Sequence, residues 1–170
     1  MAKITYITGG QRSGKSSAAQ KLALSSSKNP IYIATAVVTD DEMNNRIERH
    51  KQDRGDQWTN LEEPLYVGGL DIKENTVVVL DCVTLWLSSI FFKNNESVNE
   101  SLLFFKNEWK KLTTKNIDLI VVSNEIGMGL HADTKMGRKF TDLQGWVNQI
   151  IAKDADQAIF MVSGIEIKIK

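Results

Sequence analysis

Residues 9–16, with the sequence GGQRSGKS, match the pattern G-x-x-x-x-G-K-[ST] between a β-rich run and a helical run. In such a loop, backbone N–H groups turn inward around phosphate oxygens, and the following helix N-terminus adds partial positive charge. Lys15 is expected to reach the terminal phosphates as a catalytic residue, and the Ser16 hydroxyl to ligate Mg²⁺. The predicted nucleotide-binding residues are Gly9, Gly10, Gln11, Arg12, Ser13, Gly14, Lys15 and Ser16. An ordinary glycine-rich turn is the alternative.

His50, one of two histidines in the chain, lies within a cluster of cationic residues. A capping box predicts a helix that begins at about residue 40, on which Arg46 and Arg54 lie one turn before and after His50. Neighbouring positive charge disfavours the imidazolium form, so a neutral ring with a free lone pair is expected. Such a ring can act as a nucleophile on phosphorus. The alternative is a histidine packed on a half-apolar helix face, and the pattern alone leaves both open.

Acidic or amide side chains end two apolar runs that are typical of buried strands. Asp81 follows the apolar residues of the run 76–82, and it is predicted to be the second Mg²⁺-side group that a phosphate loop needs. Its alternative is a strand-end acid that caps the next helix. Asn124 and Glu125 follow the run 117–123, where an α/β sheet binds ligands. For them, a simple turn and a role in the nucleotide or substrate site both stay open.

Strand patterns alternate with helix patterns along the chain. The expected strands cover residues 4–8, 31–38, 76–82, 117–123, 158–164 and 165–170, the last as a half-exposed edge. The expected helices begin at Ser16 and at about residue 40, cover 97–112, and include Phe140 to Ile151. Residues 55–75 read as a loop with at most a short strand, and Trp86, Trp109 and Trp146 are expected to pack. This order predicts one α/β domain over residues 1–170, with three layers and a mostly parallel sheet.

Composition restricts the partners and the compartment. Lys plus Arg equals Asp plus Glu, 21 each, so no overall field attracts nucleic acid, and none is expected as a partner. No apolar run approaches the roughly 20 residues of a membrane span. Cys82 is the one cysteine, and the N-terminus shows no apolar leader, so a reducing cytoplasm is the expected compartment.

Seven segments occur in an order that resembles a known enzyme family. They are TGGQRSGKS, YIATA, DDEMNNRIERHKQDR, WTNLEEP, VLDCVTLW, VSNEIGMG and VSGIEIKIK. The chain is similar over residues 5–170 to the bifunctional adenosylcobinamide kinases and adenosylcobinamide-phosphate guanylyltransferases of cobalamin assembly. The block R-I-x-x-H-x-x-x-R makes the resemblance specific, because general nucleotide kinases do not share it.

The resemblance implies a RecA-like P-loop NTPase fold and two reactions. In the first, ATP or GTP phosphorylates the aminopropanol hydroxyl of adenosylcobinamide. In the second, GMP passes from GTP to adenosylcobinamide phosphate through a guanylyl-histidine, giving adenosylcobinamide-GDP and releasing pyrophosphate. Mg²⁺ is the implied cofactor, and a homotrimer is the implied assembly.

The resemblance also assigns roles to residues. His50 matches the histidine that carries GMP. The further residues that match nucleotide-contacting positions are Ala34, Thr35, Ala36, Lys51, Gln52, Asp53, Arg54, Glu62 and Asp81. Two positions depart from the family: Arg49 stands where some members have a second histidine, and Asp81 stands where a glutamate occurs in relatives. The shorter Asp81 is expected to reach Mg²⁺ through a water.

Two other functions stay open from the residues alone. One is a P-loop small-molecule kinase that lacks guanylyl transfer and would never hold GMP covalently. The other is a RecA-like nucleotide switch, in which nucleotide binding alters a macromolecular partner. The even charge balance argues against a nucleic-acid partner for such a switch.

Overall fold

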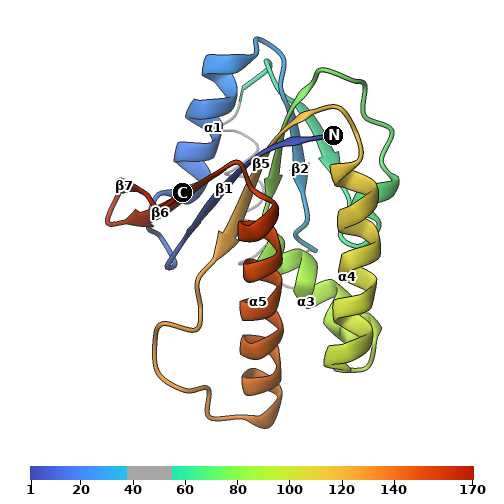
Figure 1. Ribbon diagram of the computed structural model, residues 1–170, viewed down its shortest axis with the longest axis vertical. Helices are drawn as coiled ribbons and strands as arrows, with labels where there is room; N and C mark the ends of the chain where they lie inside the picture. Colours follow the sequence, from blue (N-terminus) through green and yellow to red (C-terminus); the bar gives the residue numbers. More distant parts are fainter. Residues whose placement is uncertain (38–54) are drawn as a thin grey trace.

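A computed structural model describes residues 1–37 and 55–170, and its strands form one seven-stranded sheet (Figure 1). The strands are β1 (Lys3–Gly9), β2 (Ile31–Ala34), β3 (Thr59–Glu62), β4 (Val77–Asp81), β5 (Asp118–Asn124), β6 (Gln157–Val162) and β7 (Ile165–Lys168). Their order across the sheet is β3-β2-β4-β5-β1-β6-β7, and every pair is parallel except the antiparallel pair of β6 and β7. The expected mostly parallel sheet is therefore confirmed.

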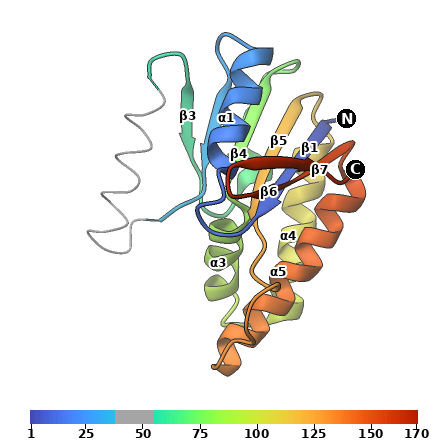
Figure 2. The ribbon, with the colours of Figure 1, turned by 90° about the vertical axis from the view of Figure 1, so that its left-hand side faces the viewer.

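Helices cover both faces of the sheet, which gives three layers (Figure 2). The helices are α1 (Lys15–Ser26), α3 (Val83–Lys93), α4 (Val98–Thr113) and α5 (Lys135–Asp154), with a 3-10 turn at Val67–Gly69. Helix α1 lies on one face, and α3, α4 and α5 lie on the other. Both faces of β4 and β5 are consequently buried, and this explains why their sequences are continuous apolar runs.

Side chains alternate between two core clusters along each central strand. On the α1 face, Ile7, Val79 and Val122 pack with the alanines of α1. On the opposite face, the larger cluster contains Trp86, Phe105 and many aliphatic side chains of α3, α4 and α5. Helix α4 begins where the Ser97 side chain accepts from the Glu100 N–H, and α5 begins where Thr134 accepts from the Gly137 N–H.

Several element boundaries differ from the sequence-based predictions. Strand β2 ends at Ala34, so the predicted strand 31–38 is too long. The region 55–75 contains β3, which forms because its backbone pairs with β2, although its sequence TNLE has no apolar alternation. The helix predicted from about residue 40 lies outside the described residues. In the described part of the chain, none of the helices has the length and apolarity that crossing a membrane requires.

Candidate nucleotide site

The predicted phosphate loop, residues 9–16, connects β1 to α1 at the carboxyl edge of the sheet. Only glycine fits at Gly9 and Gly14, the two glycine positions that the motif fixes. Gly9 has φ +151°, and a Cβ there would lie 2.4 Å from the Met161 carbonyl oxygen, while Gly14 has φ +98°. The Ser13 carbonyl accepts from the Gly164 N–H at 3.0 Å. The loop is thus held against the β6–β7 turn by backbone contacts.

Lys15 is the first residue of α1 and is only 7% exposed. Its ammonium group donates to the Gly10 carbonyl at 2.5 Å and to Ser13 Oγ at 3.4 Å. Burial lowers the pKa of Lys15, while the Cys82 and Asp81 side chains oppose that shift. The charge therefore lies inside the loop, within electrostatic reach of the acid that ends β4.

Asp81 ends β4, two strands away from β1. The Tyr32 hydroxyl donates to Asp81 Oδ2 at 2.8 Å, and the Tyr32 ring packs edge-on against Trp58 with 5.7 Å between the ring centroids. Helix α3 begins after Cys82 with no side-chain cap, so the described contacts do not support the alternative of a capping aspartate. Tyr32 thereby orients one oxygen of the predicted Mg²⁺-side carboxylate.

Thr35, predicted to contact nucleotide, is fully buried. Its hydroxyl donates to the Cys82 carbonyl at 2.7 Å and accepts from the Cys82 N–H at 2.9 Å. These two bonds fasten the end of β2 to the end of β4. The Thr35 side chain therefore has a structural part in the site, whereas Ala34 and Ala36 on either side of it are partly exposed.

Glu62 shares a row of the sheet with Asp81, because Ala34 of β2 pairs with both. The two acids are two strand spacings apart, roughly 10 Å. Glu62 is exposed on β3, the sheet edge far from the phosphate loop. The structure thus brings Lys15 and Asp81 together but places Glu62 farther along the same edge.

Five predicted site residues lie outside the described residues, and they are His50, Lys51, Gln52, Asp53 and Arg54. The described chain stops at Val37, three residues after β2 ends at the edge that carries Asp81. It resumes at Gly55, before β3. Val37, the described residue before this segment, therefore lies near the sheet edge that carries Asp81.

Tyr6 lies in β1, buried on the face that α5 covers. Burial raises the pKa of Tyr6 to about 12; Thr8 opposes the shift and the Glu125 carboxylate adds to it. In the unfolded chain a tyrosine releases its proton near pH 10, whereas folded Tyr6 keeps its proton to about pH 12. The contribution of protonated Tyr6 to the free energy of unfolding is therefore complete below pH 10 and is lost as the pH rises through 12. From pH 9 to pH 12, we expect the unfolding free energy of Tyr6→Phe to fall by about 2 kcal/mol less than that of wild type.

Urea unfolding at the two pH values measures this difference, and Tyr66→Phe, whose ring is 49% exposed, is the matched control. Equal losses of unfolding free energy in wild type and Tyr6→Phe would contradict the raised pKa of Tyr6.

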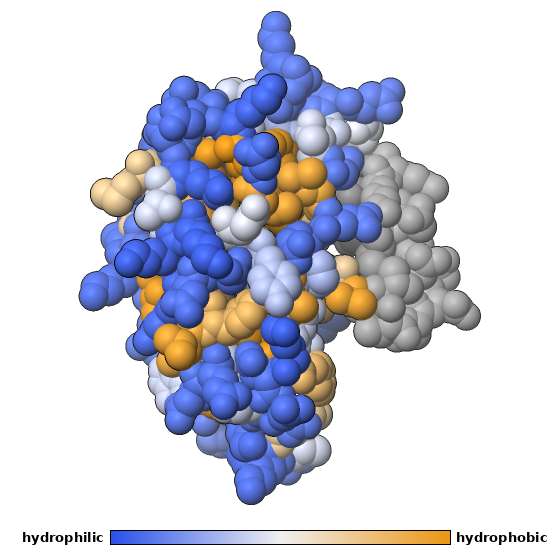
Figure 3. Space-filling model, turned by 90° about the vertical axis from the view of Figure 1, so that its right-hand side faces the viewer, coloured by the Kyte–Doolittle hydropathy of each residue, from blue (hydrophilic) through white to orange (hydrophobic). Residues whose placement is uncertain are grey.

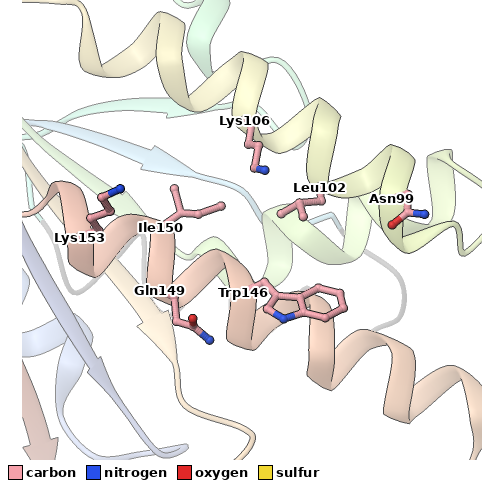
Figure 4. Close-up of a pocket in the computed structure, with 7 residues that line it drawn as sticks. All are labelled: Asn99, Leu102, Lys106, Trp146, Gln149, Ile150 and Lys153. Carbon is pink, nitrogen blue, oxygen red and sulfur yellow. The ribbon is translucent and has the colours of Figure 1, made fainter.

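A groove of about 560 Å³ lies between α4 and α5, away from the phosphate loop (Figure 4). Its lining residues are Asn99, Leu102, Lys106, Trp146, Gln149, Ile150 and Lys153. Trp146 is 46% exposed here, so the expectation that it packs in the core is wrong, whereas Trp86 and Trp109 are buried. The surface of the molecule on the α4 side is mostly hydrophilic, with apolar patches between the polar side chains (Figure 3). The groove is on the opposite face of the sheet from α1.

Comparison with known proteins identifies the family. The family model described as "Cobinamide kinase / cobinamide phosphate guanyltransferase" matches residues 5–169. The chain belongs to this family. The resemblance expected from the seven sequence segments is confirmed, and with it the assignment to a family of transferases.

Two curated members of the cobinamide kinase family match nearly the whole chain. "Bifunctional adenosylcobalamin biosynthesis protein CobU" of Escherichia coli (strain K12) is 34% identical over 181 residues, covering 96% of this chain and 98% of that protein. "Bifunctional adenosylcobalamin biosynthesis protein CobP" of Pseudomonas aeruginosa is 34% identical over 171 residues, covering 96% and 95%. The segment with His50 falls within residues 5–169, the region that the family model matches.

A solved structure shows the fold class. An ATPase from the type III secretion system of pathogenic bacteria superposes with a TM-score of 0.53 at 11% identity, covering 98% of this chain and 56% of that chain. At this identity the likeness concerns the fold alone. It confirms the expected three-layer α/β fold with a mostly parallel sheet.

Tyr32 was not predicted from the sequence as a partner of Asp81. The two residues share a face of the sheet because Ala34 pairs with Asp81 and Tyr32 lies two residues before Ala34 in β2. A sequence-based search could have found it only after β2 was placed beside β4.

Proposed function

We propose that the protein phosphorylates adenosylcobinamide with ATP or GTP and then transfers GMP from GTP to adenosylcobinamide phosphate. The observation that carries the proposal is the phosphate loop, with the Lys15 ammonium inside it and Asp81 on the same sheet edge, in a chain whose family match includes the His50 block. The names of the curated relatives, bifunctional adenosylcobalamin biosynthesis proteins, support both reactions.

In the kinase reaction, the loop N–H groups and Lys15 hold the terminal phosphates of the nucleotide. The aminopropanol hydroxyl of adenosylcobinamide attacks the γ-phosphorus in line. A bond forms between the hydroxyl oxygen and that phosphorus while the bond from the phosphorus to the β–γ bridging oxygen breaks. ADP or GDP leaves, and the hydroxyl proton passes to bulk water. Lys15 offsets the negative charge that collects on the bridging oxygen.

In the guanylyl transfer, the same loop holds the β- and γ-phosphates of GTP as the leaving group. Neutral His50 attacks the α-phosphorus, so that a P–N bond forms and pyrophosphate leaves. A phosphate oxygen of adenosylcobinamide phosphate then attacks the same phosphorus, the P–N bond breaks, and the histidine is regenerated. Lys51, Gln52, Asp53, Arg54 and Glu62 are proposed to contact the guanosine nucleotide, together with Ala34 and Ala36, which flank the buried Thr35.

Ser16 and Asp81 are proposed to hold Mg²⁺, directly or through a water. Both offer hard oxygen donors, and Tyr32 orients the carboxylate. Within residues 1–37 and 55–170, no three His, Cys, Asp or Glu side chains gather into a metal site. That fits Mg²⁺, which usually takes one or two protein oxygens and completes its shell with phosphates and water. When bound, the ion neutralises charge on the phosphate oxygens.

A homotrimer in the cytoplasm, without nucleic-acid partners, completes the proposal. The balanced charge supports the absence of a polyanionic partner. Edge strand β7 supports self-association, because its Ile165 and Ile167 are 66% and 46% exposed, and Ile169 directly after it is 59% exposed. An exposed apolar edge of this kind is a surface that another subunit can cover.

The direct test incubates the purified protein with adenosylcobinamide, Mg²⁺ and either ATP or GTP, and identifies the products by mass spectrometry. We expect adenosylcobinamide phosphate with either nucleotide and adenosylcobinamide-GDP with GTP alone. Formation of the phosphate without the GDP product would instead indicate a plain small-molecule kinase. Hydrolysis that only single-stranded DNA stimulates would indicate a nucleotide switch.

A further inference from the structure

A buried polar cluster lies between α5 and the carboxyl halves of β1 and β5. It consists of Ser123, Gln144 and Asn148, which are 0%, 1% and 6% exposed. The Ser123 hydroxyl donates to Asn148 Oδ1 at 2.7 Å, and the Gln144 amide donates to Ser123 Oγ at 3.0 Å and to Asn148 Oδ1 at 2.9 Å. These bonds fix the Asn148 amide group with its Nδ2 directed away from the cluster.

Asn148 Nδ2 donates to the carbonyl oxygen of Asn124, the last residue of β5, at 3.1 Å. The Asn124 N–H donates to Thr84 Oγ1 at 3.1 Å. The next N–H, of Glu125, donates to the Gly9 carbonyl at 3.0 Å. The backbone of Asn124 is therefore held from α5, from α3 and from the start of the phosphate loop at once.

Strand alternation indicates where the Asn124 side chain lies. Ser123 faces α5, whereas Ile120 and Val122 belong to the core cluster on the α1 face, so Asn124 follows them on the α1 face. Asn124 pairs in register with Gly9, and β5 lies between β1 and β4 in the sheet. Its amide consequently lies on the face and edge that also carry Lys15 and Asp81.

We propose that Asn124 is a further polar residue of the nucleotide site, facing the terminal phosphate, and that Asn148 is a positioning residue that fixes it there. This inference rests on the proposed kinase reaction. A side-chain amide can donate to a phosphate oxygen or orient the attacking hydroxyl, and its geometry matters in the transfer step more than in nucleotide binding, to which the loop contributes most contacts.

The energetics of the cluster favour a role in geometry. Apolar side chains of similar size at positions 144 and 148 would pack between α5 and β5 without polar desolvation. In addition, the buried Gln144 Oε1 accepts no hydrogen bond within the described part of the chain, which costs stability. What the polar cluster gives that an apolar one cannot is the directed bond from Asn148 to the end of β5.

The kinetic test compares Asn148→Ala with Val147→Ala, its fully buried neighbour on α5, which has no part in the cluster. Both variants lose packing, so both are expected to melt at lower temperature. At a temperature where both are folded, we expect kcat for adenosylcobinamide phosphorylation to fall about tenfold in Asn148→Ala only, with nucleotide Kd changed less than threefold. Equal losses of kcat in the two variants would overturn the inference.

A double-mutant cycle tests whether Asn148 acts through Asn124. Asn124→Ala is expected to lower kcat at least as much as Asn148→Ala, and the double variant to lose no more than Asn124→Ala alone. Additive losses would show that the two residues act separately and would overturn the positioning role.

A readout that needs no cobinamide separates this inference from the proposed function. The Asn124 side-chain amide resonance, assigned by its loss in Asn124→Ala, is expected to shift when a non-hydrolysable GTP or ATP analogue binds, and to shift less in Asn148→Ala than in Val147→Ala. A wild-type protein that shows this shift but does not phosphorylate adenosylcobinamide would refute the proposed function and keep the site. An unchanged resonance would overturn the inference even if both activities are present.

Discussion

Replacement of His50 by alanine is expected to abolish guanylyl transfer and to leave adenosylcobinamide phosphorylation within a few-fold of wild type. The histidine forms the covalent bond to GMP in one reaction and has no bond to make in the other. Loss of a nucleophile leaves only binding and charge stabilisation, so the rate of guanylyl transfer should fall by a factor on the order of 10⁴ or more. The variant would thus separate the two activities.

The measurement is covalent labelling with GTP that carries radioactive phosphorus at the α-position. Wild type should take up label through an acid-labile, base-stable bond, and His50→Ala should take up none. His131→Ala is the matched control, because His131 is the other histidine and lies exposed in the loop before α5. Label that persists in His50→Ala, or that disappears in His131→Ala, would refute the assignment of the nucleophile.

Features with short-range causes could be predicted from the sequence. The phosphate loop is a contiguous motif, and the glycine requirement at Gly9 and Gly14 follows from backbone geometry that the motif itself encodes. Strands β4 and β5 could be predicted because burial on both faces demands continuous apolar runs. Once these strands are parallel, Asp81 and Asn124 must end at the same edge of the sheet as the phosphate loop.

Features that depend on pairing between distant segments could not be predicted. Strand β3 forms through its contact with β2, and its own residues carry no strand signal. The two hydrogen bonds of the Thr35 hydroxyl join it to the backbone of Cys82, 47 positions away in sequence. The bond from Asn148 to Asn124 likewise joins a helix to a strand that precedes it by 24 positions. No local pattern marks such partners.

Replacement of Lys15 by methionine is expected to remove both activities without unfolding the protein. Methionine keeps an unbranched side chain of similar length in the loop, but it removes the charge that is proposed to offset negative charge on the transferred phosphoryl groups. By analogy with the loss of one oriented donor, kcat should fall roughly 10²- to 10³-fold in each reaction. Steady-state kinetics of phosphorylation and of guanylyl transfer measure the two losses separately.

The stability of the same variant distinguishes a catalytic lysine from a structural one. Burial lowers the pKa of Lys15, which means that the folded protein holds the charged form at a cost in desolvation. Removal of that charge relieves the cost, so Lys15→Met should melt at the wild-type temperature or above it. Lys21→Met, on the exposed side of α1, should change neither activity nor melting. A marked fall in the melting temperature of Lys15→Met would show instead that the ammonium group, through Gly10 and Ser13, holds the loop together. An unchanged or higher melting temperature with reduced activity would identify Lys15 as a position where the fold gives up stability for the charge that the proposed chemistry needs.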